Sequence, residues 1–300
     1  MVAGAGTGKT AVISARIAYL ITKRGVRPEN ILALTFTDKA ATEMQDRVDS
    51  IISYGALDCD ISTFHSLGDK ILRENSHDIG LPSDFVVMSK FQQILQMQEV
   101  IEKLRLKYHK SLSNPYSFAE SLLQFISKLK DENISPSKFD KFFKNRSKSL
   151  KKLDSQEYIR VNELNKIYKS YNEICLQKGL IDYGDQIVKV IELLGKNSSI
   201  LNKYQKKYQY ILIDEFQDTN YSQAYLVKLL TNKQQNIMVV GDDDQSIYRF
   251  RGANIKNILS FEEEYKDVKI VLKKNYRSTQ LILDKSYQFI QNNNPSISRR

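Results

Sequence analysis

The sequence predicts an α/β fold with a mostly parallel sheet and an inserted helical subdomain. Residues 210–213 form a continuous apolar run, which is typical of a central parallel strand buried on both faces. A glycine-rich phosphate-loop pattern stands near the start of the chain, and residues 81–179 have a helical pattern with little strand signal. Together these features favour a phosphate-binding α/β domain interrupted by an all-helical insertion.

The composition of the 300 residues suits a globular protein with an anionic partner. Hydrophobic residues make up 41% of the chain, enough for packed cores, and the formal net charge is +10. Such a charge favours a polyanion, either nucleic acid or an anionic membrane surface. Cys59 and Cys175 show no metal or disulfide spacing, which favours a reducing compartment. Because neither a membrane-spanning apolar run nor a signal peptide is evident, we expect a soluble, cytoplasmic protein.

The first candidate site is a phosphate loop. Its glycines let the backbone curl so that N–H groups converge on phosphate oxygens, Lys9 can reach the terminal phosphates, and the Thr10 hydroxyl can bind Mg²⁺. A merely flexible glycine-rich loop is the alternative. We expect the strand that should lead into the loop to be missing, because the chain starts two residues before the motif. The predicted binding residues are Ala3, Gly4, Ala5, Gly6, Thr7, Gly8, Lys9 and Thr10.

Two further strands are predicted before the insertion. Residues 31–37 form one, followed by a helix at 38–52, and Thr37 is a candidate helix cap or ligand contact. Residues 60–66 lead from a short strand into another helix. Phe64 and His65 at this junction could stack on a base or contact a nucleic-acid backbone. However, a Phe in this position is more often part of the core, and a lone His is more often only hydrogen-bonded.

Asp214 and Glu215 follow the apolar run at 210–213. In open parallel sheets, ligand-binding and catalytic residues usually lie at the carboxyl ends of the strands. Neighbouring side chains of a strand point to opposite sides, so one acid can hold a metal ion while the other polarises water. A solvated turn would explain an isolated Asp-Glu pair, but the phosphate loop elsewhere in the chain favours a reaction centre.

Two later segments carry further candidates. The buried strand at residues 237–245 ends in polar residues, among which Gln245 could sense a terminal phosphate or its attacking water. Tyr248 and Phe250 then alternate with arginines, including Arg251, as in a base-stacking platform. The last predicted strand, residues 268–272, leads to Tyr276, which could stack on adenine, and Arg277, which could reach the γ-phosphate.

With these blocks the chain resembles the first motor domain of the superfamily 1A DNA helicases of the UvrD/PcrA/Rep type. In chain order the matching blocks are AGAGTGKT, ALTFTDKAATEM, STFHS, IDYGD, ILIDEFQDTN, VVGDDDQSIYRFRGA and NYRST. The resemblance covers nearly the whole chain and is weakest in the insertion, which corresponds to subdomain 1B. It implies a RecA-like P-loop NTPase fold, ATP with Mg²⁺, 3′→5′ movement, and single-stranded DNA or a single-strand/duplex junction as partner.

The resemblance also implies roles for the matching residues. Lys9 and Thr10 would bind phosphates and Mg²⁺, with Asp214 as the metal-site acid. Glu215 would activate the attacking water, and Gln245 would couple the γ-phosphate to DNA movement. The expected catalytic residues are Lys9, Glu215, Gln245 and Arg277; the expected nucleotide contacts outside the loop are Arg16, Tyr276 and Arg277; and the expected DNA contacts are Thr37, Phe64, His65, Tyr248, Phe250 and Arg251.

The resemblance further predicts how the chain is divided. We expect RecA-like parts at residues 1–80 and 180–280, the 1B-like insertion at 81–179, and the start of a second motor domain at 281–300. Because the rest of that second RecA-like domain is expected to be missing, a fragment unable to unwind DNA alone is the favoured interpretation. Two alternatives stay open: a non-enzymatic module that binds ATP and single-stranded DNA, and the ATPase part of a helicase–nuclease subunit.

Overall fold

The computed structural model describes residues 1–52, 58–104, 106–109, 115–246, 257, 261, 265 and 269–291. The chain divides into two compact units. Unit 1 comprises Met1–Thr63, Asn202–Asn220 and Leu230–Arg300, and unit 2 comprises Phe64–Leu201 and Tyr221–Leu229. The finer division predicted at residues 80, 179 and 280 stays a prediction.

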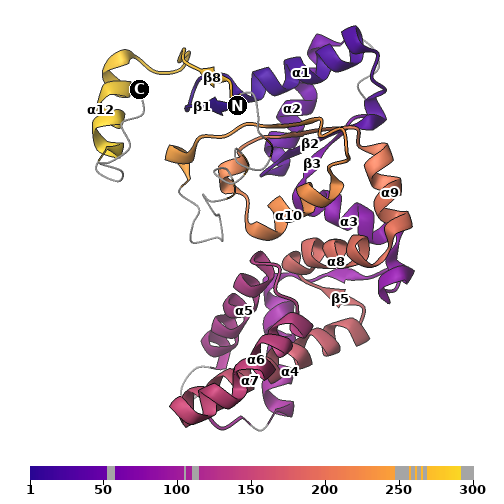
Figure 1. Cartoon of the computed structure of the whole chain (residues 1–300), viewed down its shortest axis with the longest axis vertical. Coiled ribbons are helices and arrows are strands. Elements are labelled where there is room, and N and C mark those ends of the chain that lie inside the picture. Colours follow the sequence, from indigo (N-terminus) through magenta and orange to yellow (C-terminus); the bar gives the residue numbers. More distant parts are fainter. Residues whose placement is uncertain are drawn as a thin grey trace. The chain divides into compact units, whose positions relative to one another are not determined.

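Unit 1 is built on a parallel sheet (Figure 1). Four strands pair in the order β3-β2-β6-β7, and each pairing is parallel. This sheet confirms the predicted α/β fold. The described elements that lie wholly or mainly in unit 1 are β1 (Val2–Ala3), α1 (Lys9–Arg24), β2 (Ile31–Thr35), α2 (Asp38–Ile51), β3 (Asp60–Thr63), α9 (Ser198–Lys207), β6 (Tyr210–Ile213), β7 (Ile237–Val239), β8 (Val271–Leu272) and α12 (Gln280–Ile290), with short 3-10 turns at Pro28–Asn30, Phe216–Asp218 and Asp243–Gln245.

The sheet of unit 1 is buried on both faces, which explains its continuous apolar strands. On one face, Ala33 of β2 and Leu212 of β6 belong to a core shared with α1 and α2. Leu34 of β2 and Ile213 of β6 are fully buried as well. The helices contribute apolar residues at helical spacing, namely Ile13, Ile17 and Leu20 from α1 and Met44 and Val48 from α2.

A short strand precedes the phosphate loop. Val2 and Ala3 form β1, which pairs in parallel with β8. On its other side, the backbone N–H of Ala3 donates to the carbonyl of Gly241 at 3.1 Å, and the N–H of Gly241 donates to the carbonyl of Met1 at 3.2 Å. The expectation that this strand would be missing is therefore wrong, because backbone pairing on both sides holds even two residues in strand geometry.

Unit 2 is mainly helical. Its described elements are α3 (Phe64–Glu74), β4 (Val86–Val87), α4 (Lys90–Lys103), α5 (Pro115–Asp131), α6 (Pro136–Leu153), α7 (Ser155–Gln177), β5 (Leu180–Ile181), α8 (Tyr183–Lys196) and most of α10 (Tyr221–Leu230), with a 3-10 turn at Ser76–Ile79. Because β4 pairs in parallel with β5, the insertion contains a short strand as well as the predicted helices. None of the helices that the structure describes is long and apolar enough to cross a membrane.

A buried group of charges ties α5 to the start of α8 in unit 2. Asp182 caps α8 by accepting from the backbone N–H of Asp185 at 3.0 Å, and the Asp185 side chain accepts from the N–H of Asp182 at 3.2 Å. The ammonium of Lys130 lies 2.7 Å from Asp182 Oδ2 and 2.9 Å from Asp185 Oδ1. Asp182 and Asp185, the two aspartates of the IDYGD block, therefore have a structural role in unit 2.

Candidate active site

The phosphate loop connects β1 to α1 in unit 1. Gly6 and Gly8 have φ angles of 76° and 88°, in the left-handed region that favours glycine. Thr7 closes the turn, with its hydroxyl donating to the Gly4 carbonyl at 2.7 Å. Gly8 is the N-cap of α1, and the first turn of α1 contains no acidic residue. The positive end of the helix dipole is therefore available to an anion in the loop.

The segment after β8 braces this loop. The side-chain amide of Asn275 donates to the Ala5 carbonyl at 2.6 Å, and the backbone N–H of Tyr276 donates to the Gly6 carbonyl at 2.9 Å. A Cβ added to Gly6 would lie only 2.6 Å from the Cβ of Arg277, so only glycine allows this close approach. A cavity of about 820 Å³ lies here, lined by Gly6, Thr7, Gly8, Ala11, Val12, Val271, Leu272, Lys273, Lys274, Tyr276 and Arg277.

Tyr276 and Arg277 therefore lie beside the phosphate loop, and the nucleotide contacts assigned to them stay predictions. Tyr276 is 73% exposed, and the Lys274 ammonium lies over its ring, 5.1 Å from the centroid. Arg277 is exposed as well. Asn275 was not among the predicted site residues, although it lies in the NYRST block, because its contact with Ala5 joins residues at opposite ends of the sequence.

Asp214 meets the phosphate loop at the carboxyl end of β6. The hydroxyl of Thr10, in the first turn of α1, donates to Asp214 Oδ2 at 2.9 Å. Asp214 is only 4% exposed, and its burial, together with the charge of Glu215, raises the pKa of its carboxyl above the ordinary value. A nearby cation would offset this cost. A hydroxyl and a carboxylate side by side are hard oxygen ligands of the kind that Mg²⁺ takes.

Glu215 has a strained backbone. Its φ of 49° and ψ of 45° put a non-glycine residue in the left-handed region. Such a conformation costs on the order of 1–3 kcal/mol and clusters at functional sites. It directs the side chain to Lys9, whose ammonium lies 2.8 Å from Glu215 Oε2. The two adjacent acids therefore make different contacts, Asp214 with Thr10 and Glu215 with Lys9. The sequence predicts different contacts from strand alternation, but β6 ends at Ile213 and the left-handed backbone of Glu215 separates the two side chains instead.

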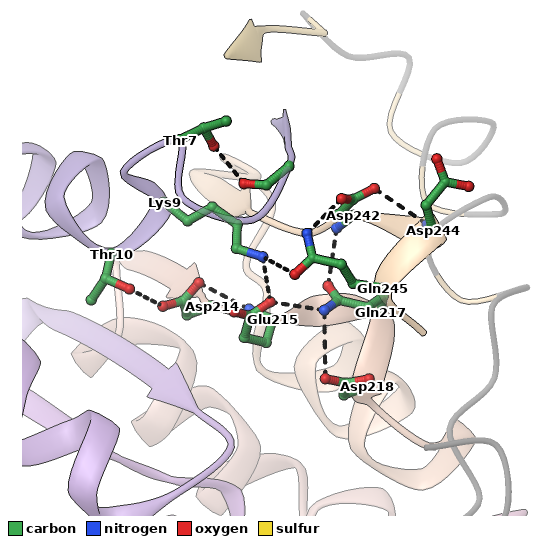
Figure 2. A network of polar contacts seen from close by, with 11 residues as sticks. Thr7, Lys9, Thr10, Asp214, Glu215, Gln217, Asp218, Asp242, Asp244 and Gln245 are labelled. Atoms are coloured by element: carbon green, nitrogen blue, oxygen red, sulfur yellow. Dashed lines mark hydrogen bonds and ion pairs between the residues drawn. The ribbon is translucent and has the colours of Figure 1, made fainter. Parts of the chain in front are cut away.

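Gln245 completes a closed ring of polar contacts, which Figure 2 shows. Lys9 donates to Gln245 Oε1 at 3.2 Å, and Gln245 Nε2 donates to Asp242 Oδ2 at 2.5 Å. The backbone N–H of Asp242 donates to Gln217 Oε1 at 3.1 Å, and Gln217 Nε2 donates to Glu215 Oε2 at 2.8 Å. Gln217 and Asp242 were missing from the predicted site, and their presence in the DEFQD and GDDDQ blocks was the available signal.

Asp218 lies beside this ring. Burial and the charge of Glu215 raise the pKa of its carboxyl to about 6. Among the described residues, Oδ1 of Asp218 is buried without a hydrogen-bond partner, while Oδ2 lies 3.5 Å from Gln217 Nε2. The site therefore holds a further carboxyl group, whose pKa is raised above the ordinary value.

Arg16 and Thr37 of unit 1 take no part in the polar contacts described above around the phosphate loop. Arg16 lines a separate cavity of about 190 Å³ with Tyr210 and Met238, at the amino-terminal side of β6 and β7. Thr37 is exposed and caps α2, its hydroxyl accepting from the N–H of Ala40 at 3.1 Å. Their roles as nucleotide and DNA contacts stay predictions.

Phe64 and His65 start α3 in unit 2. Phe64 is 2% exposed, so it is part of the core, which is one of the roles that the sequence left open for it. His65 is half-buried and meets the ring of Tyr183 edge-on, with 5.7 Å between the centroids. Tyr248, Phe250 and Arg251 lie outside the described residues. The DNA contacts assigned to all five stay predictions.

Comparison with known proteins decides the family. A model of the UvrD/REP helicase N-terminal domain matches residues 1–266. This chain belongs to the UvrD/REP helicase family. Its parallel α/β unit with a phosphate loop is the RecA-like P-loop fold of the UvrD/REP N-terminal domain.

Relatives of this UvrD/REP chain are longer than the chain itself. It is 41% identical to ATP-dependent DNA helicase PcrA of Bacillus subtilis over 295 residues, which are 98% of this chain and 37% of that protein. It is 38% identical to DNA helicase II of Haemophilus influenzae, over 100% of this chain and 39% of that protein. DNA helicase II of Rickettsia typhi is 41% identical over 98% of this chain and 42% of its own length. The chain thus spans about two fifths of these relatives.

Proposed function

We propose that this chain is the ATP-binding and ATP-hydrolysing part of a DNA helicase motor that moves 3′→5′ along single-stranded DNA. The observation that carries the proposal is the meeting of Lys9, Glu215 and Gln245 beside the phosphate loop. Three groups from three separate elements converge where the loop and the start of α1 would hold phosphates. ATP and DNA are proposed as the substrates because the chain belongs to the UvrD/REP helicase family and is similar to a protein named as an ATP-dependent DNA helicase.

In the proposed site, the loop and Lys9 bind the β- and γ-phosphates of ATP. A phosphate oxygen competes with Glu215 and Gln245 for the Lys9 ammonium, so binding frees both side chains from Lys9. Glu215 then orients the attacking water and accepts its proton, while Gln245 contacts the γ-phosphate and Arg277 stabilises its charge. Tyr276 stacks on adenine. Positioning and electrostatics provide most of the catalysis in phosphoryl transfer.

The residues present also fit Mg²⁺. Thr10 and Asp214 would hold it, because their oxygens are already 2.9 Å apart and Asp214 is a buried carboxylate whose pKa is raised. No group of three or more His, Cys, Asp or Glu able to hold a metal is found in the described part of the chain. This agrees with an ion that takes few protein ligands and completes its shell with phosphate oxygens and water. Bound Mg²⁺ would neutralise charge on the phosphates.

The proposed DNA partner is a single strand or a junction of single strand and duplex. The formal net charge of +10 supports a polyanionic partner. Stacking of bases on Tyr248 and Phe250, with Arg251 beside them, is part of the proposal. A second RecA-like domain is the other proposed partner, since the relatives extend far beyond the matched region. Unwinding by residues 1–300 alone is not part of the proposal.

The test is ATP hydrolysis by the purified 300-residue chain with Mg²⁺, with and without single-stranded DNA. We expect hydrolysis that DNA stimulates, that Lys9→Ala abolishes, and that the control Lys23→Ala, exposed at the far end of α1, retains. ATP and DNA binding without hydrolysis would favour the non-enzymatic module instead. Absence of ATP binding by a folded chain would contradict the proposal.

A further inference from the structure

Gln217 links the two loops that carry Glu215 and Gln245. It is 1% exposed, so its amide group is removed from solvent. Its Nε2 donates to Glu215 Oε2 at 2.8 Å, and its Oε1 accepts from the backbone N–H of Asp242 at 3.1 Å. Its own backbone carbonyl accepts from the Ser246 hydroxyl at 3.3 Å, next to Gln245. A single buried residue therefore joins the loop after β6 to the loop after β7.

The chemistry of these contacts requires an amide. Only a side chain that donates and accepts at the same time can hold a carboxylate at one end and a backbone N–H at the other. A glutamate here could still accept from Asp242 but would repel Glu215. A methionine would fill nearly the same volume and make neither hydrogen bond.

The contacts of Glu215 leave one of its oxygens for a water. Lys9 and Gln217 both bind Oε2. Among the described residues, Oε1 of Glu215 has no hydrogen bond, and the side chain is 34% exposed. Because Glu215 has strained backbone angles, its carboxylate keeps this orientation only while its neighbours hold it. Of the two residues that bind Oε2, Gln217 is buried and uncharged. Unlike Lys9, it is not expected to move to a phosphate.

We propose that Gln217 is a positioning residue for hydrolysis, which fixes the Glu215 carboxylate and the Gln245 loop in one reactive arrangement. The inference rests on the proposed function, because it assigns Gln217 to the same ATP site. When a phosphate draws Lys9 out of the ring, the links Glu215–Gln217–Asp242–Gln245 are left to hold the two loops together. Gln217 itself touches neither nucleotide nor water, and it acts through Glu215 and Gln245.

The test compares Gln217→Met and Gln217→Glu in the full 300-residue chain. We expect kcat for DNA-stimulated ATP hydrolysis to fall by roughly 10²-fold, the loss typical of a reacting group misplaced by about 1 Å, while KM and ADP affinity stay close to those of the unchanged chain. The split between kcat and KM is what a purely structural role would not produce. Glutamate has nearly the same shape as glutamine. If Gln217→Met does not fold, kcat and KM are therefore measured on Gln217→Glu.

The control is Gln186→Met. Gln186 is 5% exposed, lies on α8 in unit 2, and donates to Asp69 at 3.4 Å. It is thus also a buried glutamine, but outside the ring, and this variant should keep the kcat of the unchanged chain. An unaltered kcat in folded Gln217→Met or Gln217→Glu would overturn the positioning role alone. Failure of the unchanged chain to bind or hydrolyse ATP would instead overturn the proposed function, and this inference with it.

Discussion

The Lys9 ammonium and the Glu215 carboxylate form an ion pair of 2.8 Å between the start of α1 and the end of β6. Lys9 is 8% exposed, so the pair is shielded on the side of the lysine. The Lys9 ammonium that would bind phosphate is thus already paired with the Glu215 carboxylate that would activate water. A phosphate therefore has to compete with Glu215 for Lys9. A triphosphate has to offset this attraction before it gains the ammonium.

Replacing Glu215 by glutamine should separate ATP binding from hydrolysis. Glu215→Gln removes the proposed general base, so kcat should fall by roughly 10²–10⁴-fold. It also removes the anion that competes for Lys9, so ATP affinity should be equal or higher. Titration with a fluorescent ATP analogue and steady-state hydrolysis measure the two effects. Glu29→Gln, exposed in the 3-10 turn before β2, is the control. Hydrolysis at the original rate in Glu215→Gln would contradict the proposed role.

Adding a methyl group at Gly6 should disrupt the contact between the phosphate loop and the segment after β8. Gly6→Ala forces a left-handed φ of 76° on a residue with a Cβ, and that Cβ would lie 2.6 Å from Arg277 Cβ and 3.0 Å from Asn275 Oδ1. We expect a loss of about 1–3 kcal/mol in the free energy of unfolding, and weaker ATP binding. Denaturant unfolding and nucleotide titration check both.

Gly195→Ala is the matched control for Gly6→Ala. A Cβ at Gly195, near the end of α8, would meet no atom within 4 Å apart from its chain neighbours and the nearby backbone of its own helix. This substitution should leave nucleotide affinity unchanged and stabilise the chain slightly, since alanine is the better helix former. Equal nucleotide affinity in both variants would show that the close approach of Gly6 and Arg277 is not needed.

The fold and the centre of the site were predictable because their signals are local. The apolar run of β6 followed by Asp214 and Glu215, and the glycine pattern around Lys9, each lie within a few consecutive residues. Parallel strands then bring their carboxyl ends to one edge. This is why Lys9, Thr10, Asp214, Glu215 and Gln245, which the sequence assigns to one site, are linked by hydrogen bonds and an ion pair.

The bracing contacts were not predictable, because they depend on tertiary packing. Asn275 reaches Ala5 across nearly the whole sequence, and Gln217 meets Asp242 only because β6 and β7 are neighbours in the sheet. The left-handed backbone of Glu215 also has no sequence signal, since glutamate rarely adopts it. Phe64 was ambiguous for another reason. The sequence allows either burial in the core or stacking on a base, and only the fold shows that Phe64 is buried.

Asp218→Asn should stabilise the chain in a pH-dependent manner. Burial and the charge of Glu215 raise the pKa of Asp218 from 3.8 to about 6, so the folded state binds this proton more tightly than the unfolded state. The group therefore favours folding below pH 3.8, and that contribution is lost as the pH rises through about 6. Asparagine carries no such dependence.

The melting temperature is the measurement for this variant. The gain of Asp218→Asn over the unchanged chain should be small near pH 4, grow through pH 6 and level off above it. Asp46→Asn, at an exposed aspartate on α2, is the control substitution. A gain independent of pH would mean that Asp218 has the same pKa in the folded and unfolded states.

Removing the charge of Lys130 should destabilise unit 2 strongly. Lys130 is 2% exposed and is paired with both Asp182 and Asp185. Burial acts to lower the pKa of its ammonium, but the two carboxylates outweigh this and raise the pKa above the ordinary value. Lys130→Met leaves two buried carboxylates without their cation, which typically costs about 3–5 kcal/mol. Lys128→Met, exposed on the same helix, should cost little. Denaturant unfolding that gave equal stabilities for the two variants would show that the aspartates find another partner or take up protons at little cost.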